Sequence, residues 1–180
     1  MTLLIFAGKT PRIDPAAFVA SGAQLIGDIE IGPEASIWYN CVLRGDVNRI
    51  RIGARTNIQD GSVLHVDSPK PGDDRGHPTL IGEDVLIGHM AMVHGCILHD
   101  RAFVGLGAIV MDGCEIESDA MLAAGAMLTP GKRIPSGQLW AGRPAKYVRD
   151  LSPEELVGMQ AGVAHYVALA RAHAAALRSG

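Results

Sequence analysis

A large apolar residue returns at every sixth position along most of this chain. Hexads cut from Thr79 onward carry it at their second position as far as residue 140, and two earlier blocks follow the same rule. Such a series does not arise by chance when only about a third of the residues are large and apolar. The residues expected to point inward are Ile13, Val19, Leu25, Ile31, Ile37, Leu43, Ile52, Ile58, Leu64, Leu80, Leu86, Met92, Leu98, Val104, Val110, Ile116, Leu122, Leu128, Ile134 and Trp140.

The sixth residue of most hexads is small, as at Ala35, Ser62 and Ala126. A short strand with one large inward side chain, followed by a turn with one small inward side chain, describes a flat side and a tight corner. Three hexads then close one triangular coil, and stacked coils form parallel strands about 4.8 Å apart. Each coil buries its apolar edge only against its neighbours, as in other solenoids. The pattern predicts an all-β solenoid of hexapeptide repeats, a parallel β-helix of about seven coils.

The period breaks at two places. Three residues, NRI, are extra between Val47 and Arg51, and ten are extra at 69–78, which reads PKPGDDRGHP. A segment so rich in proline, glycine and aspartate is typical of a loop, and loops often carry function. We expect residues 1–150 to form the β-helix, with the loop insertion at 69–78, and the coil to close without this loop.

The pattern changes to that of a helix after the last hexad. Ser152 and Glu155 form a capping box, with Pro153 at the first helical position. Apolar residues then recur at intervals of three and four as far as Leu177. We expect residues 151–180 to form one long C-terminal α-helix, whose apolar stripe lies along the solenoid or on a neighbouring subunit.

Composition narrows the classes of partner. The net charge of −3 gives no basic surface, which argues against nucleic acid and anionic membranes. The N-terminal TLLIFAG lacks a basic region and is too short for a signal sequence or a membrane span. A cytoplasmic location is therefore expected. Three cysteines without a CxxC pair argue against a disulfide framework.

His65, His89 and His94 are the candidate metal ligands. With residues 51–56 assigned to side A of the prism, the hexad count puts His65 and His94 on side C of adjacent coils and His89 on side B. His89 cannot comfortably join the other two within its own chain. The spacing therefore predicts a site between subunits, with side B of one copy against side C of the next. Contacts of this heterologous kind close after three members, which predicts a homotrimer.

Three neutral imidazoles that leave a fourth position open are the ligand set of a catalytic zinc. Imidazoles also suit iron or cobalt, so these metals remain alternatives. The other histidines are interpreted as surface or structural residues: His77, His99, His165 and His173.

Other polar residues fall near the same place. Arg44 and Asp46 lie on side C one coil below His65, and Gln59 and Asp60 lie on side B one coil below His89. The Arg44–Asp46 pair could tie coils or subunits together, or act in catalysis.

The cysteines and one tyrosine complete the candidates. Cys41, Cys96 and Cys114 occupy the small inward corner, so their thiols should point away from the metal side. Tyr166 belongs to the helix stripe and could reach the site from outside, although an aromatic at this spacing is more often part of a core.

Four motifs resemble those of the gamma-class carbonic anhydrases and their bacterial relatives, from about Pro15 into the C-terminal helix. They are LRGD at 43–46, NIQDGSVLH at 57–65, IGHMAMVHGC at 87–96 and AGRPAKYVR at 141–149. The resemblance implies a trimeric, left-handed β-helix. It also implies that the metal ligands are His65, His89 and His94, the middle one from the adjacent subunit, that Arg44 and Asp46 form a salt bridge, and that Gln59 lies near the metal-bound water.

The function implied by the resemblance is the reversible hydration of carbon dioxide to bicarbonate, with a metal that acidifies a water molecule. The archaeal type of this family carries proton-shuttling glutamates where this chain has NRI, which has no carboxylate. Asp67, Asp73, Asp74 and His77 of the second loop are candidate substitutes. Two alternatives remain open: an acyltransferase that uses one histidine as a base, and a metal-binding trimer with little or no carbonic anhydrase activity.

Overall fold

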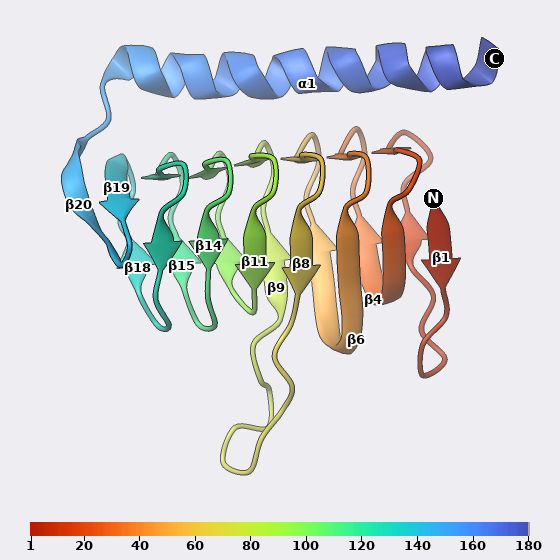
Figure 1. The fold of residues 1–180 in the computed structure, drawn as a ribbon, viewed down its shortest axis with the longest axis horizontal. Coiled ribbons are helices and arrows are strands. Elements are labelled where there is room, and N and C mark those ends of the chain that lie inside the picture. Colours follow the sequence, from red (N-terminus) through yellow and green to blue (C-terminus); the bar gives the residue numbers. More distant parts are fainter. Residues whose placement is uncertain (180) are drawn as a thin grey trace.

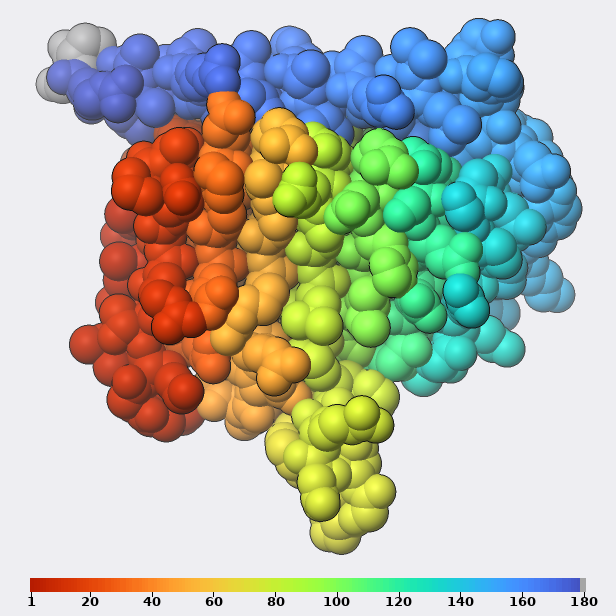
Figure 2. All heavy atoms as spheres, turned by 180° about the vertical axis from the view of Figure 1, so that it is seen from behind, coloured from red at the N-terminus to blue at the C-terminus, as the bar shows by residue number. Residues whose placement is uncertain are grey.

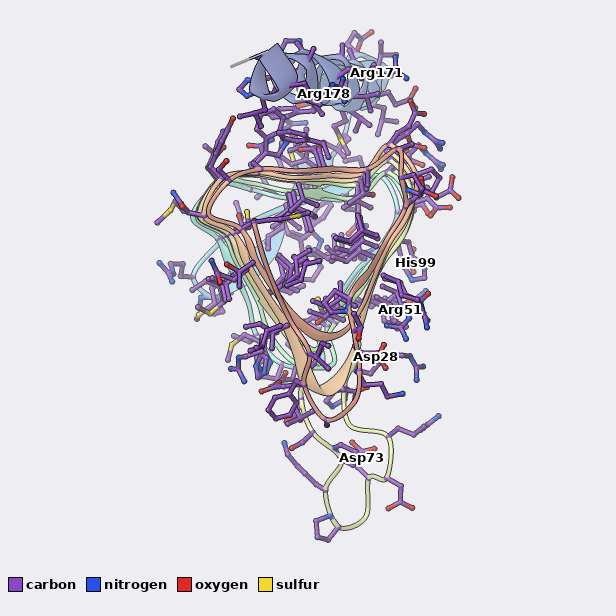
Figure 3. The ribbon with its side chains drawn as sticks, turned by 90° about the vertical axis from the view of Figure 1, so that its right-hand side faces the viewer. Asp28, Arg51, Asp73, His99, Arg171 and Arg178 are labelled. Atoms are coloured by element: carbon purple, nitrogen blue, oxygen red, sulfur yellow. The ribbon has the colours of Figure 1, made fainter. Side chains whose placement is uncertain are left out.

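Triangular coils stack into a prism, and one long helix lies along one side of it (Figures 1 and 3). The computed structural model describes residues 1–179. Twenty strands lie between Thr2 and Asp150, and helix α1 spans Pro153–Ser179. The predicted parallel β-solenoid with a C-terminal helix is confirmed, while its left-handed sense and the division into two domains stay predictions.

Each side of the prism is a ladder of short parallel strands. Side C holds β1 (Thr2–Leu4), the first parts of β4 (Gln24–Ile31) and β6 (Val42–Ile52), β8 (Val63–His65), β11 (Met92–His94), β14 (Ile109–Val110) and β17 (Met127–Leu128). Side A holds β2 (Arg12–Ile13), the second parts of β4 and β6, β9 (Thr79–Ile81), β12 (Ile97–Leu98), β15 (Glu115–Ile116) and β18 (Arg133–Ile134).

Side B forms a separate sheet. Its strands are β3 (Phe18–Val19), β5 (Ser36–Ile37), β7 (Asn57–Ile58), β10 (Leu86–Ile87), β13 (Phe103–Val104), β16 (Met121–Leu122), β19 (Gln138–Gly142) and β20 (Ala145–Asp150). β20 pairs antiparallel with β19 and so ends the parallel stack.

One inward residue per strand fills the interior. Leu43, Leu64 and Val93 lie in register on side C and are fully buried. The corners are closed by small residues, and a buried hydroxyl at a corner bonds to the next coil: Thr56 Oγ1 donates to the Gly82 carbonyl at 2.8 Å, and Ser62 Oγ to that of Gly88 at 3.1 Å.

The expected inward residues are wrong in one stretch, residues 79–96. Leu80 is half-buried and Met92 is 47% exposed. Leu86 is 7% exposed on side B, where α1 contacts β10. The inward residues here are Ile81, Ile87 and Val93.

The error has a simple cause. Each of these hexads has apolar residues at both its second and third positions, so the period alone cannot choose between them. The coil also contains a shortened hexad, because the inward Leu98 follows the inward Val93 by five positions. The corrected register leaves the assignment of residues to sides unchanged.

Helix α1 runs back over side B, toward the N-terminal end of the prism (Figure 1). The predicted capping box is present: the Glu155 amide donates to Ser152 Oγ at 3.3 Å, and the Ser152 amide to Glu155 Oε2 at 2.9 Å. The helix contacts β3, β5, β7 and β10, and Trp38 meets the rings of Tyr166 and His173 at 5.4 and 5.0 Å. The sequence predicted that side B of one copy packs against side C of the next. Because the helix covers side B, a neighbouring subunit cannot lay its side C flat against that sheet.

The two insertions lie together at the turn between sides C and A. Residues 66–78 project from this edge as a loop (Figures 2 and 3). The NRI insertion lies within β6, which bends through the corner as one long strand. Asn48 Nδ2 donates to the carbonyls of Asp67 and Arg75, at 3.1 and 2.8 Å, and so holds the loop to β6. Among residues 1–179, no helix is long and apolar enough to cross a membrane.

Replacing residues 69–76 with a short Gly-Ser link should leave the solenoid folded, because the loop adds no inward residue and loop length has a weak effect on closure entropy. Circular dichroism should show an unchanged strand signal, and sedimentation should show an unchanged oligomeric state. A change in oligomeric state would mean that the loop belongs to an interface.

Substituting Cys96 with serine should cost about 1 to 3 kcal/mol of unfolding free energy, because a hydroxyl would replace the thiol in an apolar interior. Cys96 is 1% exposed. Urea unfolding measures the cost.

Cys114→Ser is the matched control. The Cys114 thiol lies in an equivalent corner, 3.1 Å from the Thr129 carbonyl, which a hydroxyl can use as an acceptor. The Cys114→Ser chain should therefore lose less unfolding free energy than the Cys96→Ser chain, and equal losses would contradict this expectation.

Candidate metal centre

His65 and His94 lie side by side on the outer surface of side C. Each directly follows an inward residue, Leu64 or Val93, and the two histidines are paired in the ladder between β8 and β11. Their ring centroids are 4.9 Å apart, and Nδ1 of His65 is 2.9 Å from Nε2 of His94. The predicted juxtaposition of these two residues is therefore present within one chain.

A carboxylate lies beside the remaining ring nitrogen of each histidine. His65 Nε2 is 2.9 Å from Asp46 Oδ1, and His94 Nδ1 is 2.5 Å from Asp112 Oδ1. An ionised carboxylate only accepts hydrogen bonds, so it selects the tautomer with the proton on that nitrogen. The lone pairs of His65 Nδ1 and His94 Nε2 are then left facing one another.

Two facing lone pairs at this distance repel unless a cation or a proton lies between them. Their arrangement suits a metal ion bound to both nitrogens. A carboxylate on the far nitrogen of each ligand is the usual outer shell of a metal-bound histidine, since it fixes the tautomer and orients the ring. The chemistry of these two histidines therefore fits a divalent metal.

His89 lies elsewhere, in the turn between sides B and C. It has the same kind of support, since its Nδ1 is 2.8 Å from Asp60 Oδ2, and its Nε2 faces the Tyr166 hydroxyl at 3.4 Å. Within residues 1–179 of one chain, no group of three His, Cys, Asp or Glu side chains is placed to hold a metal. One chain thus presents two candidate ligands on side C and a third, also paired with a carboxylate, at the B–C turn.

Burial lowers the pKa of His65, and the nearby charge of Arg44 adds to this effect against the opposing hydrogen bond to Asp46. Burial acts to raise the pKa of Asp46, but the hydrogen bond from His65 and the Arg44 guanidinium outweigh it and hold that pKa below its ordinary value. The pair is therefore biased toward a neutral imidazole and an ionised carboxylate, the states a metal ligand and its support require. Arg44 Nη1 lies 2.5 Å from Asp46 Oδ2, as the sequence led us to expect.

Gln59 is 4% exposed and is held at both ends of its amide. Its Oε1 accepts from the His89 backbone amide at 3.2 Å, and its Nε2 donates to Asn57 Oδ1 at 3.1 Å. Asn57 Nδ2 is buried without a partner in the described chain. Gln59 thus holds the backbone of His89.

Tyr166 reaches the site from α1. Its hydroxyl is 3.4 Å from His89 Nε2, and its ring packs on Trp38. Burial and the charge of Asp60 raise the pKa of the Tyr166 hydroxyl, which keeps it a hydrogen-bond donor at neutral pH.

Asp112 was missed by the sequence analysis, and Asp60 was placed near His89 without a role. A signal existed for both: each directly precedes a turn glycine, one coil away from a histidine. This signal could be used only with the exact register between neighbouring coils in hand.

Of the remaining candidates, His77 lies against Gly95, the residue after His94, whereas several others are paired elsewhere. Among the loop carboxylates, Asp67 pairs with Lys70 at 2.7 Å, and Asp73 accepts from the Arg75 amide. His99 bonds to Glu115, and His173 to Tyr39. The three thiols are buried, as expected.

The three sides differ in their outer surfaces. On side C, one outward column is apolar from Val42 to the C-terminal end of the ladder: Val42, Val63, Met92, Ile109 and Met127. On side A, the corresponding column is mostly charged and includes Arg51, which pairs with Asp28 at 2.7 Å (Figure 3). Side C is therefore the exposed side suited to contact another protein surface.

A groove of about 680 Å³ between α1 and the A–B turn holds none of the candidate site residues. Its arginines are already paired, Arg55 with Asp84 at 2.7 Å and Arg101 with Asp119 at 2.8 Å. This leaves them little capacity to bind a charged ligand.

Comparisons with known proteins bear on the family and the fold of the chain. No protein-family model matches the chain. A carbonic anhydrase of Geobacillus kaustophilus is 41% identical over 155 residues, which cover 86% of this chain and 81% of that protein. A gamma carbonic anhydrase of Arabidopsis thaliana, named as mitochondrial, is 47% identical over 173 residues, 96% of this chain but only 62% of the plant protein. The chain thus spans less than two thirds of that relative.

A solved structure gives the same fold. A hexapeptide transferase family protein from Anaplasma phagocytophilum superposes with a TM-score of 0.88 at 48% identity, covering 95% of this chain and 97% of that one. This neighbour is named for a transferase family, whereas the sequence relatives are named for carbonic anhydrase, a lyase. The predicted family is therefore confirmed, and the chain belongs to the gamma carbonic anhydrases.

Proposed function

We propose that this protein is a metal-dependent carbonic anhydrase, which interconverts carbon dioxide and bicarbonate at sites shared between the subunits of a homotrimer. The observation that carries the proposal is the division of the ligands. Two histidines with facing lone pairs lie on side C, and a third, oriented by its own carboxylate, lies on the B–C turn of the same chain.

The shapes of the three sides support the trimer. Side B is covered by α1, side A is largely charged, and side C carries an apolar column beside the histidine pair and its carboxylates. The surface of one copy that can meet side C of the next is therefore the B–C turn that carries His89. A contact between two different surfaces repeats from copy to copy, and it closes when three copies complete the ring.

Zinc fits the donor set best, because three neutral imidazoles with a fourth open position form its usual catalytic site. Iron and cobalt also accept imidazole. When bound, such a metal would supply a water molecule acidic enough to act as a nucleophile at neutral pH.

The protein groups around the site then have separate tasks. Asp46, Asp60 and Asp112 hold the ligating histidines in the required tautomers. Gln59 fixes the backbone of His89, and Arg44 keeps Asp46 ionised.

The hydroxyl of Tyr166, beside His89 Nε2, can donate a hydrogen bond to an oxygen of the substrate. Carbon dioxide is apolar, so the apolar column of side C does not hinder its approach.

Two observations favour the acyltransferase alternative. His89 and Asp60 form a pair that resembles a general base oriented by a carboxylate, and a structural neighbour is named a hexapeptide transferase family protein. Zinc in the purified protein and catalysis of carbon dioxide hydration would favour the carbonic anhydrase. A metal-free protein that transfers acyl groups would favour the alternative. A protein that binds zinc but does not hydrate carbon dioxide would favour the other alternative, a metal-binding trimer without turnover.

Mixing two alanine variants tests the shared site. His65→Ala and His89→Ala chains, unfolded and refolded together, should regain zinc at about a quarter of the sites, because some interfaces pair an intact side C with an intact B–C turn. The measurements are zinc content of the purified trimers and the rate of carbon dioxide hydration.

The matched control is the mixture of His65→Ala with His94→Ala. Both substitutions damage side C, so every interface lacks one ligand and no zinc should return. Equal recovery in both mixtures, or none in either when mixed trimers are shown to form, would refute a site shared in this way.

Substituting Asp112 with asparagine should weaken zinc binding about 10- to 100-fold, because the tautomer of His94 would no longer be held by a carboxylate. Competition with a chelator measures the affinity. Glu115→Gln is the control, since it alters a similar carboxylate–histidine pair, with His99 at 2.6 Å, on side A. Equal losses in the two variants would show that the effect is not specific to the site.

A further inference from the structure

Met90, directly after His89, combines two unfavourable features. Its backbone has a φ of +59°, in the left-handed region that costs a side chain about 1 kcal/mol or more. Its side chain is 70% exposed. A large apolar residue that is both strained and exposed has no explanation within the single chain.

The same position in neighbouring coils is occupied differently. The residues with left-handed φ along this B–C edge are Gly22, Asn40, Gly61, Met90, Gly107 and Gly125. Apart from Asn40, these neighbours are glycines, which adopt this conformation without strain. Met90 is thus the one apolar side chain projecting from this column.

Four other non-glycine residues with left-handed φ, all on the A–B turn, form ion pairs. They are Arg55, Asp84, Arg101 and Asp119, which pair with one another at 2.7 to 2.8 Å. Met90 has no comparable partner in the described chain. Its sulfur only lies over Gly61, beside the turn residue Asp60.

Apolar side chains near Met90 extend the same edge. Leu106, in the next B–C turn, is 54% exposed, and Met92, at the start of β11, is 47% exposed. These three residues lie around His89, whose Nε2 is the nitrogen away from Asp60. The surface that carries the third ligand is therefore itself apolar.

We propose that Met90 is a positioning residue that docks on side C of a neighbouring copy and thereby sets His89 against that copy's His65 and His94. This inference rests on the proposed shared site and adds to it the side chain that fixes its geometry. A second copy fits as the occupant because the edge carries the ligand that side C lacks. Side C also offers the apolar column Val42, Val63, Met92, Ile109 and Met127.

The test compares Met90→Gly with Met90→Leu in the full-length, zinc-loaded protein. Glycine relieves the backbone strain but removes the docking side chain, whereas leucine keeps its bulk. Met90→Gly should raise both the trimer dissociation midpoint and the zinc dissociation constant by about tenfold or more, and Met90→Leu should stay within about threefold of the unaltered protein. Sedimentation velocity over a dilution series measures the trimer dissociation midpoint, and competition with a chelator measures the zinc dissociation constant.

Asn40→Gly is the matched control, because it makes the same change to glycine on the same edge, two coils from Met90. It should alter neither quantity by more than about threefold. Circular dichroism should show the Met90→Gly chain as well folded as the unaltered one, so a loss of zinc would not reflect unfolding.

Trimer and zinc affinities of Met90→Gly within threefold of the unaltered protein would overturn the role of Met90, and so would equal losses in Met90→Gly and Met90→Leu. A failed shared site would appear separately, as no zinc recovery in the mixture of His65→Ala and His89→Ala.

Discussion

The parallel hydrogen bonds between successive coils determine which side chains of this molecule meet. A residue on one strand lies beside residues one coil earlier and one coil later, and sequence neighbours point to other faces. His65 therefore contacts His94 across β8 and β11, while Asp46 and Asp112 reach the pair from the coils on either side. Every contact that supports the histidine pair crosses between coils. An insertion or deletion that shifted one coil by a single residue would dismantle the site even with all its residues present.

The same constraint explains what the sequence could predict. The six-residue period revealed the solenoid, and the side assignment brought His65 and His94 together without any distance information. The period failed in residues 79–96, where two adjacent positions in each hexad are apolar and one hexad is a residue short. There Val93, and not Met92, points inward. The contact between Asp112 and His94 depends on that local register and could not be read from the period.

Helix α1 decides which surfaces of the prism remain available. The amphipathic pattern predicted the helix and its capping box, but not the side on which it packs, because the stripe could lie on this chain or on a neighbour. By covering side B, the helix leaves the charged side A and the apolar side C exposed. It also brings Tyr166 to within 3.4 Å of His89. The packing of the helix thus limits how a second copy can approach and adds a hydroxyl to the candidate site.

Metal binding and subunit association are linked in the proposed trimer, because neither copy alone holds a complete ligand set. A metal that binds only the assembled form stabilises that form by mass action, and assembly raises metal affinity by the same coupling free energy. In the single chain the two free nitrogens of His65 and His94 face each other at 2.9 Å, where their lone pairs repel. In the proposed trimer a metal would remove that repulsion, and His89 of another copy would complete its set of histidine ligands. The strained and exposed Met90 beside His89 then has a physical role, since contacts that hold the copies together also hold the ligands at one point.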